Sequence, residues 1–418
     1  MKVTIQPGER YGQVKAPASK SVCHRLLILA ALGKSKTDIY CGEISADIQA
    51  TASCLRALGA EIIEHNGALS VAPVKKPPEN TVNLYCGESG STLRFLLPVA
   101  GVLGIKAVFH MDGRLAKRPV TELTDQLKKN GMYFETGYNT ISCHGRLRSG
   151  NYTLSGEVSS QYISALLMAL PLLKGDSSLN VTGCIQSQPY INISLDILKS
   201  VGIGISRQKN EYLIFGSQQP EFKHSVVAEG DYSAAAFFLC AGALSEKGIT
   251  VYNLNKNSVQ GDRKIMELLK TMGAETRQDS CSATVRKAEL KGTVIDASQI
   301  PDLVPAVAAV AALCDGETRI INAGRLRLKE SDRLSTTGKM LSDLGAYVEE
   351  LDDGLVIRGR ASLAGGITDS YNDHRIAMAA AVAAAGCKNE VTIGNAQAVK
   401  KSYPRFWSDF ESLGKEKT

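Results

Sequence analysis

The sequence lacks three features that would assign it to a specialised class of protein. Its ten cysteines include no Cys-x-x-Cys pair, which argues against a zinc site or a disulfide framework. Its longest apolar runs, residues 303–314 and 376–387, are too short to span a bilayer. It has no block of Lys and Arg, and its net charge is only +6. We therefore expect a globular protein with reduced thiols and no metal, nucleic-acid or membrane partner.

The N-terminal residues, Met-Lys-Val-Thr-Ile-Gln-Pro-Gly, alternate like a strand and lack the apolar core of a signal peptide. This pattern and the unpaired thiols predict a cytoplasmic location. The chain of 418 residues is too long for one hydrophobic core and suits two domains of roughly 200 residues each.

A short motif recurs six times, in which a helical stretch ends in an apolar residue that is followed shortly by glycine. Successive glycines lie 69 to 72 residues apart. A fixed period indicates one folding unit used six times. Each glycine suits the left-handed residue that ends a helix before a strand. The six are Gly59, Gly131, Gly202, Gly273, Gly345 and Gly414.

A second segment recurs half a unit out of phase, where a polar cluster opens an apolar, Ala/Leu-rich run. Helices that are apolar all round are buried ones. The polar residues are ordinary N-caps, but cations such as Lys20, Arg94 and Arg375 in a first turn oppose the helix dipole. Several together indicate a site for anions. The clusters are Ser19-Lys20-Ser21, Glu88-Ser89-Gly90-Ser91, Ser159-Ser160-Gln161, Asp231-Tyr232-Ser233, Pro301-Asp302 and Asp373-His374-Arg375.

Four motifs, in this order and at these separations, resemble the EPSP synthase family. The strongest is Arg-Leu-Lys-Glu-Ser-Asp-Arg-Leu at 327–334, and the resemblance extends from Pro17 to the C-terminus. The others are Pro-Ala-Ser-Lys-Ser-x-x-x-Arg at 17–25, Gly-x-Ser-Gly-Ser-Thr-Leu-Arg at 87–94 and Asp-His-Arg-x-Ala-Met at 373–378.

The resemblance implies an α/β (α+β) fold of two lobes, each an inside-out α/β barrel of three βαβαββ-type repeats around a pseudo-threefold axis. One lobe would comprise residues 22–225, and the other residues 1–21 joined to 226–418. The active site would lie in the cleft between the lobes. The resemblance also implies a monomer that needs no metal or organic cofactor.

The reaction implied is transfer of the enolpyruvyl group of phosphoenolpyruvate to the 5-hydroxyl of shikimate 3-phosphate, with release of phosphate. It belongs to the shikimate pathway toward chorismate and the aromatic amino acids. Two phosphates and two carboxylates must meet in one site, which requires fixed cations and favours the forked guanidinium of Arg.

The resemblance assigns the site residues one by one. For phosphoenolpyruvate they are Lys20, Gly90, Arg118, Gln161, Arg333, Arg375 and Lys401. For shikimate 3-phosphate they are Lys20, Ser21, Arg25, Ser159, Ser160, Gln161, Ser187, Asp302 and Lys329.

Asp302 is the expected general base for the 5-hydroxyl. Lys20 and Glu330 are the candidates that deliver a proton to the methylene carbon, and the sequence does not decide between them. Tyr190 is expected either against the shikimate ring or in the core, whereas His374 is expected to be structural.

The sequence departs from the family pattern at two places. Many members have Asn-Ala-Gly-Thr where this chain has Glu88-Ser89-Gly90-Ser91, and some have Asn where this chain has Arg325. We still expect the backbone at Gly90 to contact the substrate. The sequence does not decide whether Ser91 or Arg325 contacts it.

The sequence argues against two alternatives. A UDP-N-acetylglucosamine enolpyruvyl transferase typically has Lys-Asn near its N-terminus and a loop cysteine, where this chain has Lys20-Ser21 and no cysteine at 112–117. A six-repeat DNA clamp would need polar, cationic helices on its inner wall, whereas the repeated helices here are apolar.

Overall fold

The computed structural model describes residues 1–414 and divides the chain into two compact units. Unit 1 comprises Met1–Pro17 and the chain from Glu229 onward, and unit 2 comprises Ala18–Ala228. Each unit has its own hydrophobic core. The expected boundaries need a correction, because residues 18–21 and 226–228 belong to unit 2. Lys20 already opens its first helix, and a strand at Ser225–Val227 pairs with Thr37–Tyr40.

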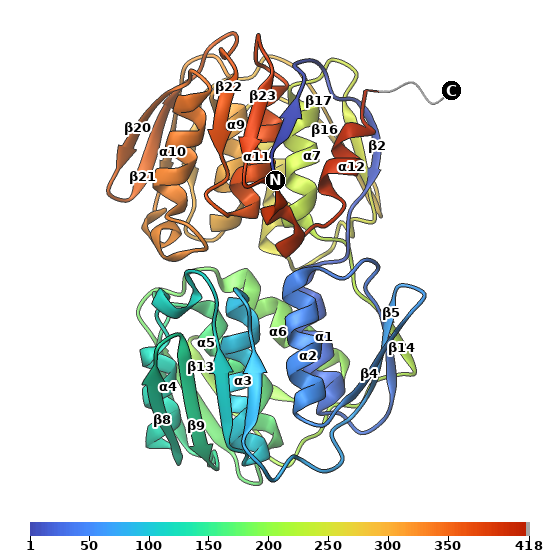
Figure 1. The fold of residues 1–418 in the computed structure, drawn as a ribbon, viewed down its shortest axis with the longest axis vertical. Coiled ribbons are helices and arrows are strands. Elements are labelled where there is room, and N and C mark those ends of the chain that lie inside the picture. Colours follow the sequence, from blue (N-terminus) through green and yellow to red (C-terminus); the bar gives the residue numbers. More distant parts are fainter. Residues whose placement is uncertain (415–418) are drawn as a thin grey trace. The chain divides into compact units, whose positions relative to one another are not determined.

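Unit 2 contains three separate four-stranded sheets and six α-helices (Figure 1). The first sheet has the order β14 (Ser225–Val227), β3 (Thr37–Tyr40), β5 (Ala68–Ala72), β4 (Glu61–His65). The second is β6 (Val82–Tyr85), β7 (Ala107–His110), β9 (Thr140–Gly145), β8 (Met132–Gly137), and the third is β10 (Asn151–Ser155), β11 (Ser177–Thr182), β13 (Glu211–Ile214), β12 (Ile205–Gln208). The helices are α1 (Lys20–Ala31), α2 (Ala46–Ala57), α3 (Gly90–Leu103), α4 (Thr121–Lys129), α5 (Ser160–Ala169) and α6 (Gln188–Ser200), with 3-10 turns η1 (Leu115–Lys117) and η2 (Leu170–Leu172).

Unit 1 repeats this plan with two four-stranded sheets and one three-stranded sheet. Their orders are β16 (Glu275–Gln278), β17 (Ser282–Arg286), β15 (Ile249–Tyr252), β2 (Gly12–Lys15); β18 (Val294–Asp296), β19 (Glu317–Ile321), β21 (Gly354–Arg358), β20 (Tyr347–Leu351); and β1 (Val3–Ile5), β23 (Val391–Gly394), β22 (Gly366–Asp369). The helices are α7 (Tyr232–Ala243), α8 (Ile265–Thr271), α9 (Val304–Ala311), α10 (Arg333–Asp343), α11 (His374–Ala384) and α12 (Phe406–Glu411), with η3 (Gly261–Lys264), η4 (Pro301–Leu303), η5 (Gly324–Leu328) and η6 (Ala396–Lys401).

The first helix of each repeat is buried inside its unit, whereas the second helix, such as α4, buries only one face. Helix α7 is buried at every position except Ser233, and helix α11 is buried along its whole length. Strands such as β6 alternate between buried and exposed residues, as expected when only one face of a sheet meets the core. This arrangement confirms the expected α/β layering, built in each unit from three separate sheets.

Every sheet combines a parallel strand pair with an antiparallel neighbour, which is the expected βαβαββ plan. In the second sheet of unit 2, β6 runs parallel to β7, and β9 pairs antiparallel with both β7 and β8. The last repeat departs from this plan, because β1 pairs antiparallel with β23. The N-terminal strand therefore takes the place that a hairpin holds in the other five repeats.

The six periodic glycines end helices as predicted. All six have positive φ, from 82° at Gly202 and Gly414 to 104° at Gly273. Each follows the second helix of its repeat by two or three residues, and a β-carbon is strained in this backbone conformation. The period in the sequence is thus a repeated helix-ending turn, which leads into a strand at Gly59, Gly131, Gly202, Gly273 and Gly345.

The predicted polar clusters lie at the entrances of the buried helices. Ser89, Ser159, Asp231 and Asp373 each accept a backbone N–H bond at the N-terminus of α3, α5, α7 and α11.

No helix within residues 1–414 combines the length and hydropathy needed to cross a membrane.

Candidate active site

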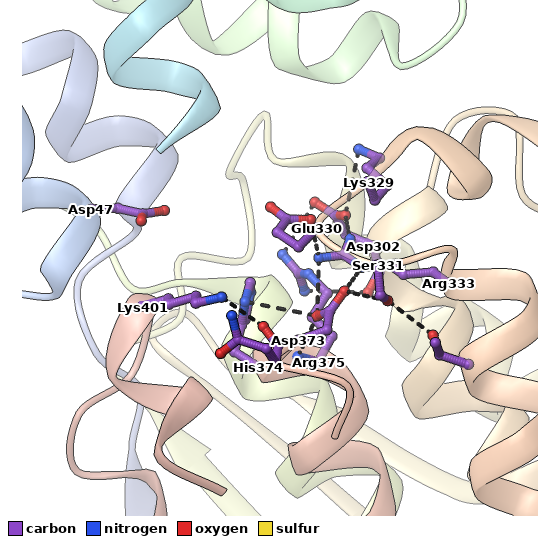
Figure 2. A network of polar contacts seen from close by, with 12 residues as sticks. Asp47, Asp302, Lys329, Glu330, Ser331, Arg333, Asp373, His374, Arg375 and Lys401 are labelled. Atoms are coloured by element: carbon purple, nitrogen blue, oxygen red, sulfur yellow. Dashed lines mark hydrogen bonds and ion pairs between the residues drawn. The ribbon is translucent and has the colours of Figure 1, made fainter. Parts of the chain in front are cut away.

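A buried network of carboxylates around Arg333 forms the polar centre of unit 1 (Figure 2). The Arg333 side chain is 1% exposed and donates to Asp373 at 2.8 Å, Asp302 at 2.7 Å and Glu330 at 2.6 Å. Helix α10 positions Arg333 in its first turn, and Asp373 is the N-cap of α11. One guanidinium therefore ties three acidic residues from separate segments into a fixed arrangement.

Burial and charge act in opposite directions on this network. Burial alone would lower the pKa of Arg333, but the carboxylates of Asp373, Glu330 and Asp302 outweigh it and raise the pKa above its ordinary value. Burial likewise would raise the pKa of Asp373, but Arg333 lowers it. Both groups are therefore held in their charged forms at neutral pH.

Asp302 lies where three cations converge. Arg333 Nη1 lies 2.7 Å from Asp302 Oδ1, Arg375 Nη2 lies 3.1 Å from Oδ2, and Lys329 Nζ lies 3.8 Å from Oδ1. The residue sits in η4 behind Pro301, at the entrance of the buried helix α9. Its side chain keeps 12% exposure, so this carboxylate stays accessible.

The other predicted residues of unit 1 border the same network. Arg375 also donates to the Asp302 carbonyl at 3.2 Å, and Lys401 donates to the Asn372 carbonyl at 2.6 Å, just before the Asp373 cap. Figure 2 shows Lys401, His374 and Arg375 around this part of the chain. His374 is buried and lies 3.8 Å from Asp373 Oδ1, in agreement with a structural role.

In unit 2, Lys20 opens helix α1 and forms an ion pair with Asp47. Lys20 Nζ lies 2.6 Å from Asp47 Oδ2, and the two side chains keep 17% and 13% exposure. Asp47 lies in the first turn of α2, where the helix dipole favours a negative charge. The pair holds the ammonium group of Lys20 at the entrance of its helix.

Gly90 begins helix α3 between two arginines. A β-carbon at Gly90 would lie 2.7 Å from Arg94 Nη1 and 2.8 Å from Arg118 Nη1. Arg94 is fixed by a 2.6 Å bond to Gln161 Oε1, and Gln161 Nε2 donates to Ser91 Oγ at 3.0 Å. Four predicted or motif residues of unit 2 thus surround one glycine, where a side chain would displace the guanidinium groups.

The predicted serines of unit 2 lie at the entrances of α5 and α6. Ser159 caps α5 by accepting from the Gln161 N–H at 3.3 Å, and Ser160 is the first residue of that helix. Ser187 precedes α6, is 3% exposed and has a left-handed φ of 56°. A buried serine in this conformation is strained, and such strain concentrates at functional sites.

Arg25 is buried against protein groups rather than open to solvent. It is 2% exposed and donates to Ser194 Oγ, Ser164 Oγ and the carbonyls of Ser21 and Tyr190, at 2.7 to 3.2 Å. Its guanidinium also lies over the Phe95 ring, 4.9 Å from the centroid. These contacts fix the backbone at Ser21, expected near shikimate 3-phosphate, and at Tyr190, expected either against the shikimate ring or in the core.

Sequence reasoning missed three acidic residues in these clusters. Asp47 pairs with Lys20, Asp373 anchors Arg333, and Asp262 in η3 accepts a bond from Ser233. Burial raises the pKa of Asp262 to about 7, with Asp302 as the next contributor. Asp373 stood in a family motif and at a helix entrance but was assigned no role, and the sequence gave no signal for Asp47 or Asp262, whose partners lie in other segments.

The fold and these clusters define an enzyme that acts on anionic small molecules and is built from six repeats in two units. Within residues 1–414, no group of three His, Cys, Asp or Glu side chains is arranged to hold a metal ion.

Comparison with known proteins gives the family. The profile of EPSP synthase (3-phosphoshikimate 1-carboxyvinyltransferase) matches residues 5–410. A 3-phosphoshikimate 1-carboxyvinyltransferase of Clostridium kluyveri is 44% identical over 99% of this chain and 97% of its own length, and one of Clostridium acetobutylicum is 43% identical over the same shares. The chain belongs to the EPSP synthase family.

Solved structures agree with this assignment. An EPSP synthase structure from Acinetobacter baumannii has a TM-score of 0.81 at 25% identity, covering 99% of this chain and 98% of that one. The enolpyruvyl transferase NikO from Streptomyces tendae, at 17% identity and a TM-score of 0.79, shares the fold.

These findings confirm the predicted family, fold class and transferase activity, and they place the chain in the shikimate pathway as expected. They also decide against the two alternatives, the transferase acting on a nucleotide sugar and the DNA clamp.

Proposed function

We propose that this chain transfers the enolpyruvyl group of phosphoenolpyruvate to the 5-hydroxyl of shikimate 3-phosphate, and that residues of both units bind this one pair of substrates. The observation that carries the proposal is the position of Asp302, an accessible carboxylate held by Arg333, Arg375 and Lys329. A base that must work beside several anionic groups needs such cations around it to hold both the base and the substrates.

Phosphoenolpyruvate is assigned to cations, one glutamine and one glycine. In unit 1 these are Arg333, Arg375 and Lys401, and in unit 2 they are Lys20, Arg118, Gln161 and Gly90. The absence of a β-carbon at Gly90 supports the assignment, because the ligand can approach the backbone beside the guanidinium of Arg118. Arg333 is so enclosed by carboxylates that we assign it to orienting Asp302 and Glu330 as well as to the ligand's charge.

Shikimate 3-phosphate is assigned to hydroxyl groups and helix entrances. Ser159, Ser160 and Ser187 supply hydroxyls and backbone N–H groups at the starts of α5 and α6, which suit a phosphate. Lys20, Ser21, Gln161, Asp302 and Lys329 complete the set. Arg25 acts indirectly, because it donates hydrogen bonds to the Ser21 and Tyr190 carbonyls and so fixes their positions.

The chemistry proceeds by addition and then elimination. Asp302 takes the proton of the 5-hydroxyl as the oxygen attacks C2 of phosphoenolpyruvate, while C3 gains a proton. Glu330 is held against Arg333 at 2.6 Å and Lys20 against Asp47 at 2.6 Å. Both are candidates for the proton delivery, and the choice between them stays open. The adduct then loses phosphate together with a proton from its C3 methyl group, which restores the double bond, and the cations stabilise the charge of the departing phosphate.

The enzyme is further proposed to act as a cytoplasmic monomer without a cofactor. The ten cysteines are free thiols and eight of them are buried, which suits a reducing compartment.

Phosphate release from phosphoenolpyruvate tests the function. Release is expected to require shikimate 3-phosphate, and UDP-N-acetylglucosamine should not replace it. Release that is indifferent to shikimate 3-phosphate, or that depends on the nucleotide sugar, contradicts the proposal.

A further inference from the structure

A buried polar chain crosses the interior of unit 2 and has no part in the roles assigned above. It consists of His24, Thr51, Thr92 and Ser89. His24 Nδ1 lies 2.8 Å from Thr51 Oγ1, which lies 2.7 Å from Thr92 Oγ1, which in turn lies 2.7 Å from Ser89 Oγ. All four residues are at most 1% exposed, and they come from α1, α2 and the entrance of α3. Such a chain is costly to bury unless its members satisfy one another.

The hydrogen bonds of the buried polar chain have one consistent direction. Burial, with Lys20 and Arg25 nearby, lowers the pKa of His24 well below its ordinary value, so the ring is neutral and carries one N–H. The Thr92 hydroxyl donates to Ser89 Oγ, so the Thr51 hydroxyl must donate to Thr92, and His24 Nδ1–H to Thr51. His24 Nε2 is then a bare acceptor, which agrees with its lack of a hydrogen-bond partner.

Both ends of the buried polar chain lie beside proposed substrate-binding groups. Ser89 caps α3 immediately before Gly90, accepting from the Thr92 N–H at 3.2 Å. His24 lies one turn after Lys20 on α1, and Thr51 lies one turn after Asp47 on α2. Thr92 Oγ1 also lies 3.5 Å from the Asp47 carbonyl. The chain therefore joins the entrances of three helices that carry Lys20, its partner and Gly90.

We propose that His24 is a positioning residue for phosphoenolpyruvate: through Thr51 and Thr92 it fixes the Ser89–Gly90 turn relative to Lys20. His24 does not touch the substrate. The inference rests on the proposed binding role of Gly90 and Lys20. Breaking the buried polar chain should therefore loosen the site of phosphoenolpyruvate and leave the site of shikimate 3-phosphate nearly unchanged.

Three substitutions test this inference. His24→Leu removes the donor and keeps a similar volume, whereas His24→Asn retains an amide N–H near the place of Nδ1–H. Thr51→Val interrupts the chain with an almost isosteric side chain, so it keeps the test usable if His24→Leu fails to fold. Thr37→Val is the matched control, because it makes the same change at a buried threonine of unit 2 outside the chain.

The readout is the KM of each substrate, from steady-state phosphate release. His24→Leu and Thr51→Val are expected to raise the KM for phosphoenolpyruvate by about five- to tenfold, the effect of losing one such hydrogen bond. The KM for shikimate 3-phosphate should stay within about twofold, and the double variant should be little worse than either single one. His24→Asn should recover most of the loss, and Thr37→Val should leave both KM values unchanged.

Three results overturn the inference. The first two are an unchanged KM for phosphoenolpyruvate in Thr51→Val and a His24→Asn enzyme no better than His24→Leu. An equal rise in both KM values also overturns it, because that indicates general loosening of unit 2. The wild-type enzyme is measured in the same series. If it releases no phosphate with shikimate 3-phosphate, the proposed function fails, which is a different outcome from a failure of the His24 role.

Discussion

At the scale of single residues, the site depends on charges that are paired before any substrate arrives. Arg333, Arg375 and Lys329 all lie within 4 Å of Asp302, and Lys20 lies 2.6 Å from Asp47. These pairs hold the cations in place in the protein interior, where an isolated charge would be unfavourable. On the proposed assignment, substrate phosphates and carboxylates meet groups that are already oriented.

Lys329 gives the site a dependence on pH. Burial lowers the pKa of Lys329 to about 8, with Asp302 opposing the shift. Below this pH the ammonium group is charged and can hold the shikimate ring, and above it the charge is lost. The KM for shikimate 3-phosphate should rise about fivefold between pH 8 and 9, as the protonated fraction falls. Lys329→Arg, which stays charged, should remove this rise, and a rise that persists in the variant would contradict the assignment.

Asp262 predicts a dependence of stability on pH. Its pKa is raised from 3.8 to about 7 by burial, so between these values the unfolded chain loses a proton that the folded protein keeps. The free energy of unfolding therefore falls as pH rises through this range. The Asp262→Asn variant can still accept the hydrogen bond from Ser233. Its free energy of unfolding should not fall in this way, because the amide does not titrate. Its Tm relative to wild type should increase from pH 4.5 to 7.5, whereas the surface variant Asp125→Asn should show no such trend.

The sequence predicted some site residues and missed others for a physical reason. Arg333, Arg375 and Lys20 stand in motifs or at helix entrances, where a cation opposes the helix dipole and so needs an explanation. Asp47 is 27 residues from Lys20, and Asp373 is 40 residues from Arg333. Only the packing of helices from different segments brings these partners together, and no spacing within one helix reveals it.

At the scale of secondary-structure elements, the repeated glycines explain how the second helix of each repeat ends, and in five repeats how the chain then enters a strand. This feature could be predicted from the sequence, because the period and the left-handed conformation follow from glycine itself. The substitution of a hairpin by β1 in the last repeat could not, because it depends on pairing between residues at opposite ends of the chain, such as Thr4 and Thr392.

Two of these glycines make a matched comparison. A β-carbon at Gly273 would lie 2.1 Å from the Glu289 carbonyl oxygen, whereas at Gly202 it would meet nothing within 4 Å. Gly202→Ala should lower the free energy of unfolding by about 1 kcal/mol through its positive φ alone. Gly273→Ala adds a backbone clash and should cost at least about 2 kcal/mol. Denaturant unfolding measures both, and equal losses would show that the clash is relieved by small backbone shifts.

At the scale of the whole molecule, the chain forms two units with separate cores, and only unit 2 is continuous in sequence. A fragment of residues 18–228 contains all three sheets of unit 2, including β14. It should fold alone and unfold cooperatively, because each core is complete within its unit.

A shorter fragment, residues 18–222, is the control for this prediction. It lacks β14, which pairs with β3, and so exposes the edge of that sheet. Circular dichroism should show a lower Tm for the shorter fragment. If residues 18–228 stay unfolded, unit 2 depends on unit 1 for its stability.

The central claim is that these charged residues bring phosphoenolpyruvate and shikimate 3-phosphate together for enolpyruvyl transfer, with Asp302 as the general base. Phosphorus NMR of the reaction mixture tests it most directly. Wild-type enzyme should convert the two substrates into inorganic phosphate and one new phosphomonoester in equal amounts, while Asp302→Asn still binds shikimate 3-phosphate but forms product at least about 100-fold more slowly. An unchanged phosphoenolpyruvate signal with wild-type enzyme, or near-normal turnover by Asp302→Asn, would contradict the account.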